Sequence, residues 1–216
     1  MPYRRTENVV RRLAEREQAI LDAAAALARE GGMGAVQIAA VAARAHIAAG
    51  TVYRYFPSKD DLVATLARSV AGAELSAMRA AADAAPGPLS ALAAGIATFA
   101  ARALAERRLT FAVMAEPVDP DVERLRLEFR RALAAELATR INAAVTRKLL
   151  PEQDAAVSAP AIVGALLEGL LGPLAPRHDE ASAAREAVQT ATILALRALG
   201  IVDARARGLV AQVALP

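Results

Sequence analysis

The chain has 216 residues, of which 56% are hydrophobic, 3% aromatic and 23% charged, so it can bury a sizeable core. It is rich in alanine, the strongest helix former and a poor strand former, which predicts an all-α protein. The absence of cysteine excludes a disulfide framework, a thiolate metal site and a cysteine nucleophile. With only His46 and His178, histidine-rich metal sites are excluded as well.

The sequence does not predict a membrane segment. The longest uncharged run, residues 84–101, contains Pro86, Gly87 and Pro88, so we do not expect a continuous apolar helix of about 20 residues. The N-terminal arginines are not followed by the apolar run of a signal peptide. We therefore expect a cytoplasmic protein.

Charge is divided unevenly along the chain, whose net charge is +3. Residues 1–70 hold ten basic and seven acidic residues, whereas residues 71–216 hold sixteen of each. The positive excess therefore lies in the first 70 residues. Five arginines cluster at the start of the chain: Arg4, Arg5, Arg11, Arg12 and Arg16. A basic patch at one end is typical of a nucleic-acid-binding protein, and a solvated tail is the alternative.

Periodicity and punctuation in the first third predict three helices and the start of a fourth. The first helix ends at Gly31-Gly32, and short helices follow over residues 37–44 and from Ala48 to Phe56. Pro57 ends the second short helix, and Ser58 with Asp61 forms a capping box that begins a long helix at Lys59. We place a domain boundary here, with residues 1–57 as one domain and 58–216 as a second.

The second domain is expected to be a helical bundle, which brings the total to about nine helices. Proline and capping residues mark the later helix starts, above all Pro88, the Asp119-Pro120-Asp121 segment and Ser158. The expected helices after the one at Lys59 cover 88–107, 109–115, a long stretch from Pro120, a stretch from Ser158 through Leu171, and 180–199.

Two short helices joined by a tight segment of about four residues indicate a helix-turn-helix unit. Val52 and Phe56 share one face of the second helix and are expected to face the core. The outward positions then include two small residues, which allow close approach to a groove, and two that project from the helix. These outward residues are Ala49, Gly50, Tyr53 and Arg54.

The stretch IAAVAARAHIAAGTVYRYFPSKDDL, from Ile38 to Leu62, resembles the DNA-binding signature of tetracycline-repressor (TetR) family regulators. The resemblance implies a homodimer, a double-stranded DNA operator and a ligand pocket in the C-terminal domain. It implies phosphate contacts from Thr51, Tyr53, Tyr55 and Lys59, and groove-facing positions at Ala49, Gly50 and Arg54.

The sequence departs from the family pattern in the turn and the caps. His46 stands where the family usually has glycine, and Gln37 and Ala48 replace the usual Ser or Thr caps. A lost cap costs about 1 kcal/mol. Gln37 remains a candidate for a phosphate contact, and direct base readout would rest mainly on Arg54, with Tyr53 and Arg44 as further candidates.

The C-terminal domain holds the candidate effector pocket and dimer interface. Large side chains on three successive helices, with a neighbouring arginine as polar anchor, are the candidate pocket residues, and a plain core is the alternative. The pocket set is Phe99, Arg102, Phe111, Met114 and Phe129. The helix over 161–171 is apolar on most sides and must be covered, which suggests an interface with the helix over 180–199. The interface set is Val163, Leu166, Leu167, Leu170 and Leu196.

These residues bear on three possible functions. The leading hypothesis is a ligand-responsive repressor that binds a palindromic operator and is released by a small apolar or amphipathic effector. An enzyme is disfavoured because no phosphate loop, metal-ligand spacing, nucleophile–base pair or cofactor motif is present. A helical interaction protein with a degenerate DNA-reading helix remains the alternative.

Overall fold

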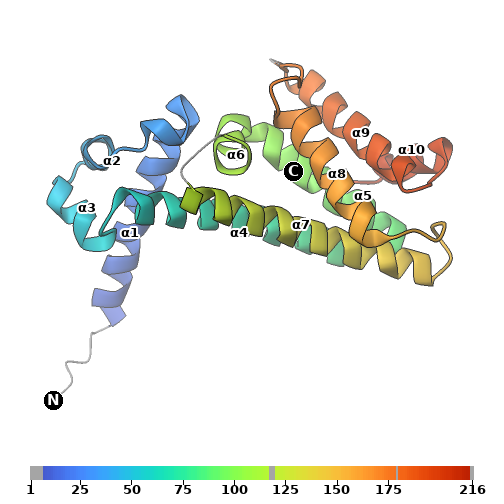
Figure 1. Cartoon of the computed structure of the whole chain (residues 1–216), viewed down its shortest axis with the longest axis horizontal. Coiled ribbons are helices and arrows are strands. Elements are labelled where there is room, and N and C mark those ends of the chain that lie inside the picture. The colour runs from blue at the N-terminus through green and yellow to red at the C-terminus, as the bar shows by residue number, and fades with distance from the viewer. Residues whose placement is uncertain (1–6, 117–119, 179, 215–216) are drawn as a thin grey trace.

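The computed structural model describes residues 7–116, 120–178 and 180–214, and within them the chain is all-α, as predicted (Figure 1). Ten α-helices are present in the described residues, one more than the roughly nine expected. The additional helix is α10 (Asp203–Ala211), which packs on α9 (Ala181–Ala198). Arg4, Arg5 and the predicted cap at Asp119 lie outside the described residues.

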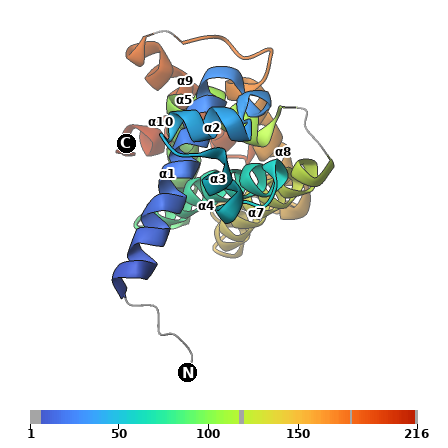
Figure 2. The same ribbon diagram turned by 90° about the vertical axis from the view of Figure 1, so that its left-hand side faces the viewer.

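Three helices pack together at one end of the molecule (Figure 2). They are α1 (Glu7–Gly31), α2 (Ile38–Arg44) and α3 (Ala49–Tyr55), with a short 3₁₀ turn, η1 (Met33–Ala35), between the first two. Their shared core contains Ile20, Val41, Val52 and Phe56, each at most 3% exposed. Burying these side chains together fixes the angle between the two short helices.

Helix α4 (Lys59–Asp83) runs from this end along the rest of the molecule (Figure 1). Its start is capped as the sequence predicts, because the Ser58 hydroxyl accepts the Asp61 backbone N–H at 3.0 Å. With 25 residues and a rise of about 1.5 Å per residue, the helix is about 37 Å long.

Helix α5 (Pro88–Ala105) is the central helix of the larger bundle and packs against α4, α7 (Pro120–Thr146) and α9. It is 18 residues long with a mean hydropathy of 1.4, so by length and composition it could cross a membrane, contrary to the sequence-based expectation. However, 61% of it is buried inside the protein. This burial is typical of a core helix, which explains its apolar composition.

The remaining helices complete the bundle around α5. They are α6 (Arg107–Met114), α8 (Ala155–Leu166) and a π-helical turn, η2 (Leu167–Leu171), that continues α8. Helix α8 begins earlier than predicted, because the Asp154 carboxylate, not Ser158, accepts the first free N–H, that of Ala156, at 2.8 Å. Ser158 lies inside the helix.

A cluster of ion pairs joins α4 to α7 on the side of the bundle. Glu136, with a side chain 9% exposed, accepts hydrogen bonds of 2.8 Å from Arg79 and from Arg140, and Arg140 also pairs with Asp83 at 2.7 Å. Burial opposes ionisation of Glu136, but the hydrogen bonds from the two arginines outweigh it and lower the pKa below its ordinary value.

Candidate DNA interface and effector pocket

The tight segment between α2 and α3 has the geometry of a helix-turn-helix. His46 adopts a left-handed conformation with φ 54°, and the Ile47 N–H reaches back to the Ala42 carbonyl at 3.0 Å. Glycine takes this conformation without strain, whereas histidine takes it at a cost in conformational energy. The turn therefore accepts His46 in place of glycine, with some loss of stability.

The outer face of α3 is open to solvent along its length. Ala49, Gly50, Tyr53 and Arg54 are exposed, with Tyr53 52% exposed. A Cβ added at Gly50 would meet no atom within 4 Å, so packing inside the chain does not require glycine there. The Arg54 guanidinium lies 5.7 Å from the centroid of the Tyr55 ring, a cation–π distance that orients the arginine.

Half-buried polar side chains lie on both sides of the open face of α3, whereas the arginine of α2 is held in an ion pair. Thr51, Tyr55 and Lys59 are half-buried at the edges of the open face. Arg44, considered for base readout, instead forms an ion pair with Glu30 at 2.7 Å. Arg54 is thus left as the main arginine at this surface.

The caps of the two short helices are weak, as the sequence predicts. Neither Gln37 at α2 nor Ala48 at α3 makes a side-chain cap hydrogen bond. Gln37 is exposed and donates its amide to the Gly34 carbonyl at 2.9 Å. The two helices therefore depend on their buried faces for their stability.

The five residues predicted to line one effector pocket lie apart in the structure. Phe99 and Met114 are core residues, 2% and 0% exposed, and Arg102 pairs with Glu74 at 2.9 Å. Phe129 borders a small cavity between α4 and α7, and Phe111 borders a different and larger one.

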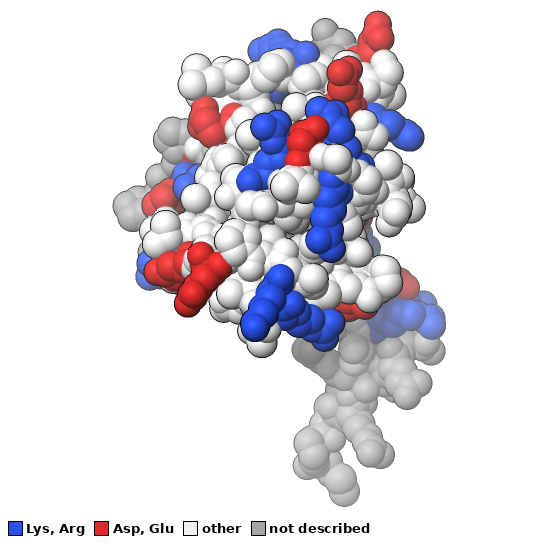
Figure 3. All heavy atoms as spheres, turned by 90° about the vertical axis from the view of Figure 1, so that its right-hand side faces the viewer, with Lys and Arg blue, Asp and Glu red and all other residues white. Residues whose placement is uncertain are grey.

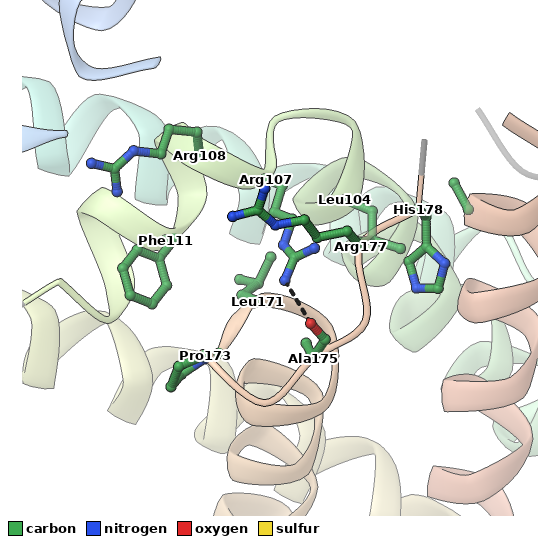
Figure 4. Close-up of a pocket in the computed structure, with 11 residues that line it drawn as sticks. Leu104, Arg107, Arg108, Phe111, Leu171, Pro173, Ala175, Arg177 and His178 are labelled. Atoms are coloured by element: carbon green, nitrogen blue, oxygen red, sulfur yellow. Dashed lines mark hydrogen bonds between the residues drawn. The ribbon is translucent and has the colours of Figure 1, made fainter. Parts of the chain in front are cut away.

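The larger cavity has a volume of about 480 Å³ and lies where the α5–α6 junction meets the loop from η2 to α9 (Figure 4). We call it the basic pocket, because its wall includes Arg107, Arg108, Arg177 and His178 and contains no acidic residue. The rest of its lining is mainly apolar and consists of Leu104, Phe111, Leu171, Gly172, Pro173, Ala175 and Ala184.

The predicted interface residues are buried within the single chain, and Leu166 and Leu170 also border the apolar groove between α8, η2 and α9. None of the five is more than 6% exposed. They are Val163, Leu166, Leu167, Leu170 and Leu196. The other face of the same helices is exposed and includes Leu194, which is 60% exposed. An apolar groove of about 400 Å³ lies between α8, η2 and α9, bordered by Ile162, Ala165, Gly169, Ala191, Leu194 and other residues.

Comparison with known proteins relates the N-terminal end to bacterial regulators. A family profile described as bacterial regulatory proteins, tetR family, matches residues 20–66, which include α2 and α3. Residues 20–66 of this chain are therefore similar to the tetR family of bacterial regulatory proteins. The HTH-type transcriptional repressor KstR of Rhodococcus jostii is 62% identical over 55 residues, 25% of this chain and 26% of KstR. The chain thus matches about a quarter of the length of that relative.

The TetR-family fold extends over the remaining residues. The regulator FadR of Bacillus subtilis, solved with stearoyl-CoA, superimposes with a TM-score of 0.72 at 18% identity and covers 84% of this chain and 98% of FadR. RolR, solved with resorcinol, has a TM-score of 0.65 at 19% identity and covers 96% and 98%. These similarities show that the chain shares the fold of FadR and RolR.

Charge is mixed at the end of the molecule opposite α2 and α3. Basic and acidic side chains are interspersed there on a largely uncharged surface (Figure 3). This agrees with the equal numbers of acidic and basic residues after position 70. The uncompensated positive charge belongs to the first third of the chain, which contains α1 to α3.

Sequence reasoning missed most of the basic pocket. It selected Phe111 and Arg102, but it did not select Arg107, Arg108, Arg177 or His178. The available signals were the Arg107-Arg108 pair at the start of α6 and the Arg177-His178 pair in a proline-rich loop. Since nearly seventy residues separate the two pairs, only the folded chain shows that they share one cavity.

Proposed function

We propose that this chain is a cytoplasmic, ligand-responsive transcriptional repressor that binds an operator as a homodimer. The observation that carries the proposal is the open face of α3, with Tyr53 and Arg54 exposed, inside the segment that matches the tetR profile. The named function of KstR supports repression, because its identity to this chain is high over 55 residues.

On DNA, α3 would enter the major groove as the recognition helix. Ala49 and Gly50 allow the helix backbone to approach closely, and Arg54 reaches a base edge, where arginine prefers guanine. Phosphates on either side would be contacted by residues at the edges of the open face and at the start of α2, which position the helix without reading sequence. This phosphate-contacting set is Gln37, Thr51, Tyr53, Tyr55 and Lys59.

The dimer would form through the exposed face of α8 and α9. Leu194 on α9 and the apolar groove beside it leave apolar surface in water that a second copy would cover. The five buried residues predicted earlier would support this surface from inside. Because such a dimer is two-fold symmetric, its operator would be an inverted repeat.

A small effector would release the repressor from DNA. RolR was solved with resorcinol and FadR of Bacillus subtilis with stearoyl-CoA, so ligands of very different size occupy proteins of this fold. In this chain the basic pocket is our candidate site for such a molecule, because its mixed lining fits an amphipathic one.

The decisive experiment is a gel shift with the DNA that flanks the gene for this chain. We expect binding at nanomolar concentration and binding to a scrambled fragment of the same length at least a thousandfold weaker, the usual specificity scale. The matched variant Arg54→Ala should lose most of this preference. Equal affinity for both fragments would overturn the repressor function.

The alternative function, a helical interaction protein with a degenerate recognition helix, rests on two features. Both short helices lack a side-chain cap, and Ala49 offers only a methyl group to a base. The same gel shift decides between the two functions, because a degenerate helix would bind neither fragment specifically.

A further inference from the structure

We propose that the basic pocket binds the anionic head group of an amphipathic effector, and that Arg108 transmits its binding to the DNA-binding end through Glu116. This inference rests on the proposed function and specifies its effector. It names the chemical class of the ligand, a carboxylate or phosphate on an apolar body. It also names the side chain that the ligand would share with the contact between the two ends of the molecule.

The charge of the pocket indicates an anion. Arg108, Arg177 and His178 surround the opening in Figure 4, with Arg107 between them. Within the described residues, no carboxylate lies within ion-pair distance of Arg177. Guanidinium groups bind carboxylates and phosphates through paired hydrogen bonds. A cluster in which Arg108 has a carboxylate partner only at 3.6 Å, that of Glu116, therefore favours such a head group.

Arg107 has a different task from the other arginines. Its guanidinium donates to the carbonyl of Pro176 at 2.8 Å and to that of Ala175 at 3.1 Å. These bonds hold the loop from η2 to α9 against the start of α6, so Arg107 builds the wall of the pocket. The loop brings Arg177 and His178 to the opening. A ligand could bind the guanidinium of Arg177 directly, whereas it would share that of Arg108 with Glu116.

The apolar part of the lining explains why the ligand should be amphipathic. Phe111, Leu171 and Pro173 lie below the basic side chains in Figure 4, and Leu104 completes that side. The pocket volume of about 480 Å³ is within the usual range for small-molecule sites. A head group at the arginines would therefore direct an apolar body onto these four side chains.

Arg108 also belongs to a contact between α6 and the DNA-binding end. Its guanidinium lies 3.6 Å from the carboxylate of Glu116, and that carboxylate accepts the backbone N–H of Met33 at 3.1 Å. Gly32, with φ 74°, lies so close that an added Cβ would collide with both side chains. The junction of α1 and η1 therefore packs directly on the Arg108–Glu116 pair.

A ligand anion and Glu116 would compete for Arg108. When the anion takes the guanidinium, Glu116 loses its cation and holds Met33 less firmly, which frees the junction of α1 and η1 to shift. DNA binding fixes that junction in one position, so DNA and ligand oppose each other. Since coupling is reciprocal, each should weaken the binding of the other by the same factor, typically about 5- to 150-fold.

Calorimetry with four probes tests the ligand class. The probes are dodecanoyl-coenzyme A, dodecanoate, coenzyme A alone and the uncharged dodecanol. We expect dodecanoyl-coenzyme A or dodecanoate to bind at least tenfold more tightly than dodecanol. The tighter of these two anionic lipids identifies phosphate or carboxylate as the preferred head group. Dodecanol binding as tightly as both anionic lipids, or no binding by any probe, would overturn the inference.

Variants locate the site. Arg177→Gln and Arg108→Gln should each weaken the better anionic probe at least tenfold and leave dodecanol unchanged. The control Arg185→Gln removes an exposed arginine of α9 that does not line the pocket, and it should bind like the parent chain. Unchanged affinity in the folded Arg177→Gln variant would place the anion elsewhere.

Hydrogen exchange tests the coupling without DNA. Saturating anionic probe should accelerate amide exchange at Met33, because its acceptor Glu116 is released. Glu116→Gln should bind the probe within about threefold of the parent and show no further acceleration. Glu106→Gln is the matched control, since it breaks the 2.5 Å ion pair to Arg29 on α1 without touching the pocket. An unchanged Met33 exchange rate in the saturated parent chain would refute the coupling.

Release from the operator is then measured as a separate result. The operator dissociation constant of the parent chain should rise at least fivefold with saturating anionic probe, and that of Glu116→Gln should stay constant. A chain that binds no operator, yet binds the probe and shows the Met33 effect, would disprove the proposed function and leave the pocket intact. Operator binding without probe binding would disprove only the pocket.

Discussion

Replacing Leu194 by arginine is the most direct perturbation of the proposed dimer. Leu194 lies on α9 at the border of the apolar groove and is 60% exposed in the single chain. Because a partner copy would cover it, the arginine would place a charge inside an apolar interface. The variant should fold normally, since the exposed position leaves the core of the bundle undisturbed.

The expected size of the effect follows from the exposed fraction. Full burial of a leucine is worth about 1.5–3 kcal/mol, so covering the 60% of Leu194 that is still exposed contributes about 1–2 kcal/mol per copy. A two-fold dimer contains the contact twice, which gives about 2–4 kcal/mol, or about 30- to 1,000-fold in the dissociation constant. Burying the unpaired guanidinium adds to this loss.

Sedimentation over a dilution series measures the dissociation constant of each variant. The matched control is Val202→Arg, because Val202 is 71% exposed but lies at the start of α10, away from the groove. We expect the control to dimerise like the parent chain. A parent chain that is monomeric at micromolar concentration, or a Leu194→Arg dimer of unchanged affinity, would refute the interface.

Three further predictions concern DNA binding and stability. Lys59→Gln should reduce the steepness of log affinity against log salt by about 1.8 for the dimer, about 0.9 for each copy, and a parent-like slope would remove Lys59 from the phosphate contacts. Arg54→Ala should cost about 1–3 kcal/mol at one base pair; an unchanged motif in binding-site selection would argue against base readout. Glu136→Gln should lower the free energy of unfolding at pH 7 by about 1–3 kcal/mol, as measured in urea, because it breaks a largely buried pairing. Because folding lowers the pKa of Glu136, this difference is fully present above the ordinary value near 4.5 and should disappear as the pH falls through the folded value; a pH-independent difference would contradict the ion-pair explanation.

Local signals in the sequence determined the helices at the DNA-binding end. The Ser58 cap, the glycines that end α1 and the spacing of Val52 and Phe56 each act within a few residues, so they have the same effect in any fold. The left-handed turn at His46 was indicated by the family resemblance, because His46 stands where the family usually has glycine. These features carried the family resemblance that the profile match confirmed.

Local signals were insufficient where two of them competed or where neither was strong. Asp154 and Ser158 are both good caps, and the earlier one begins α8. The short helix α10 follows Gly200, a strong stop, and its own pattern is too brief to predict a helix.

The tertiary structure alone decided which faces are buried and which side chains meet. The segment 161–171 is apolar on most sides, so periodicity could not show that Leu166 and Leu170 are buried in the single chain and border a groove beside α9. In the same way, no local rule brings Arg108 beside both Arg177 and Glu116, because these contacts join separate helices. A helix is specified by interactions within one turn, whereas its partners are selected by the packing of the whole chain.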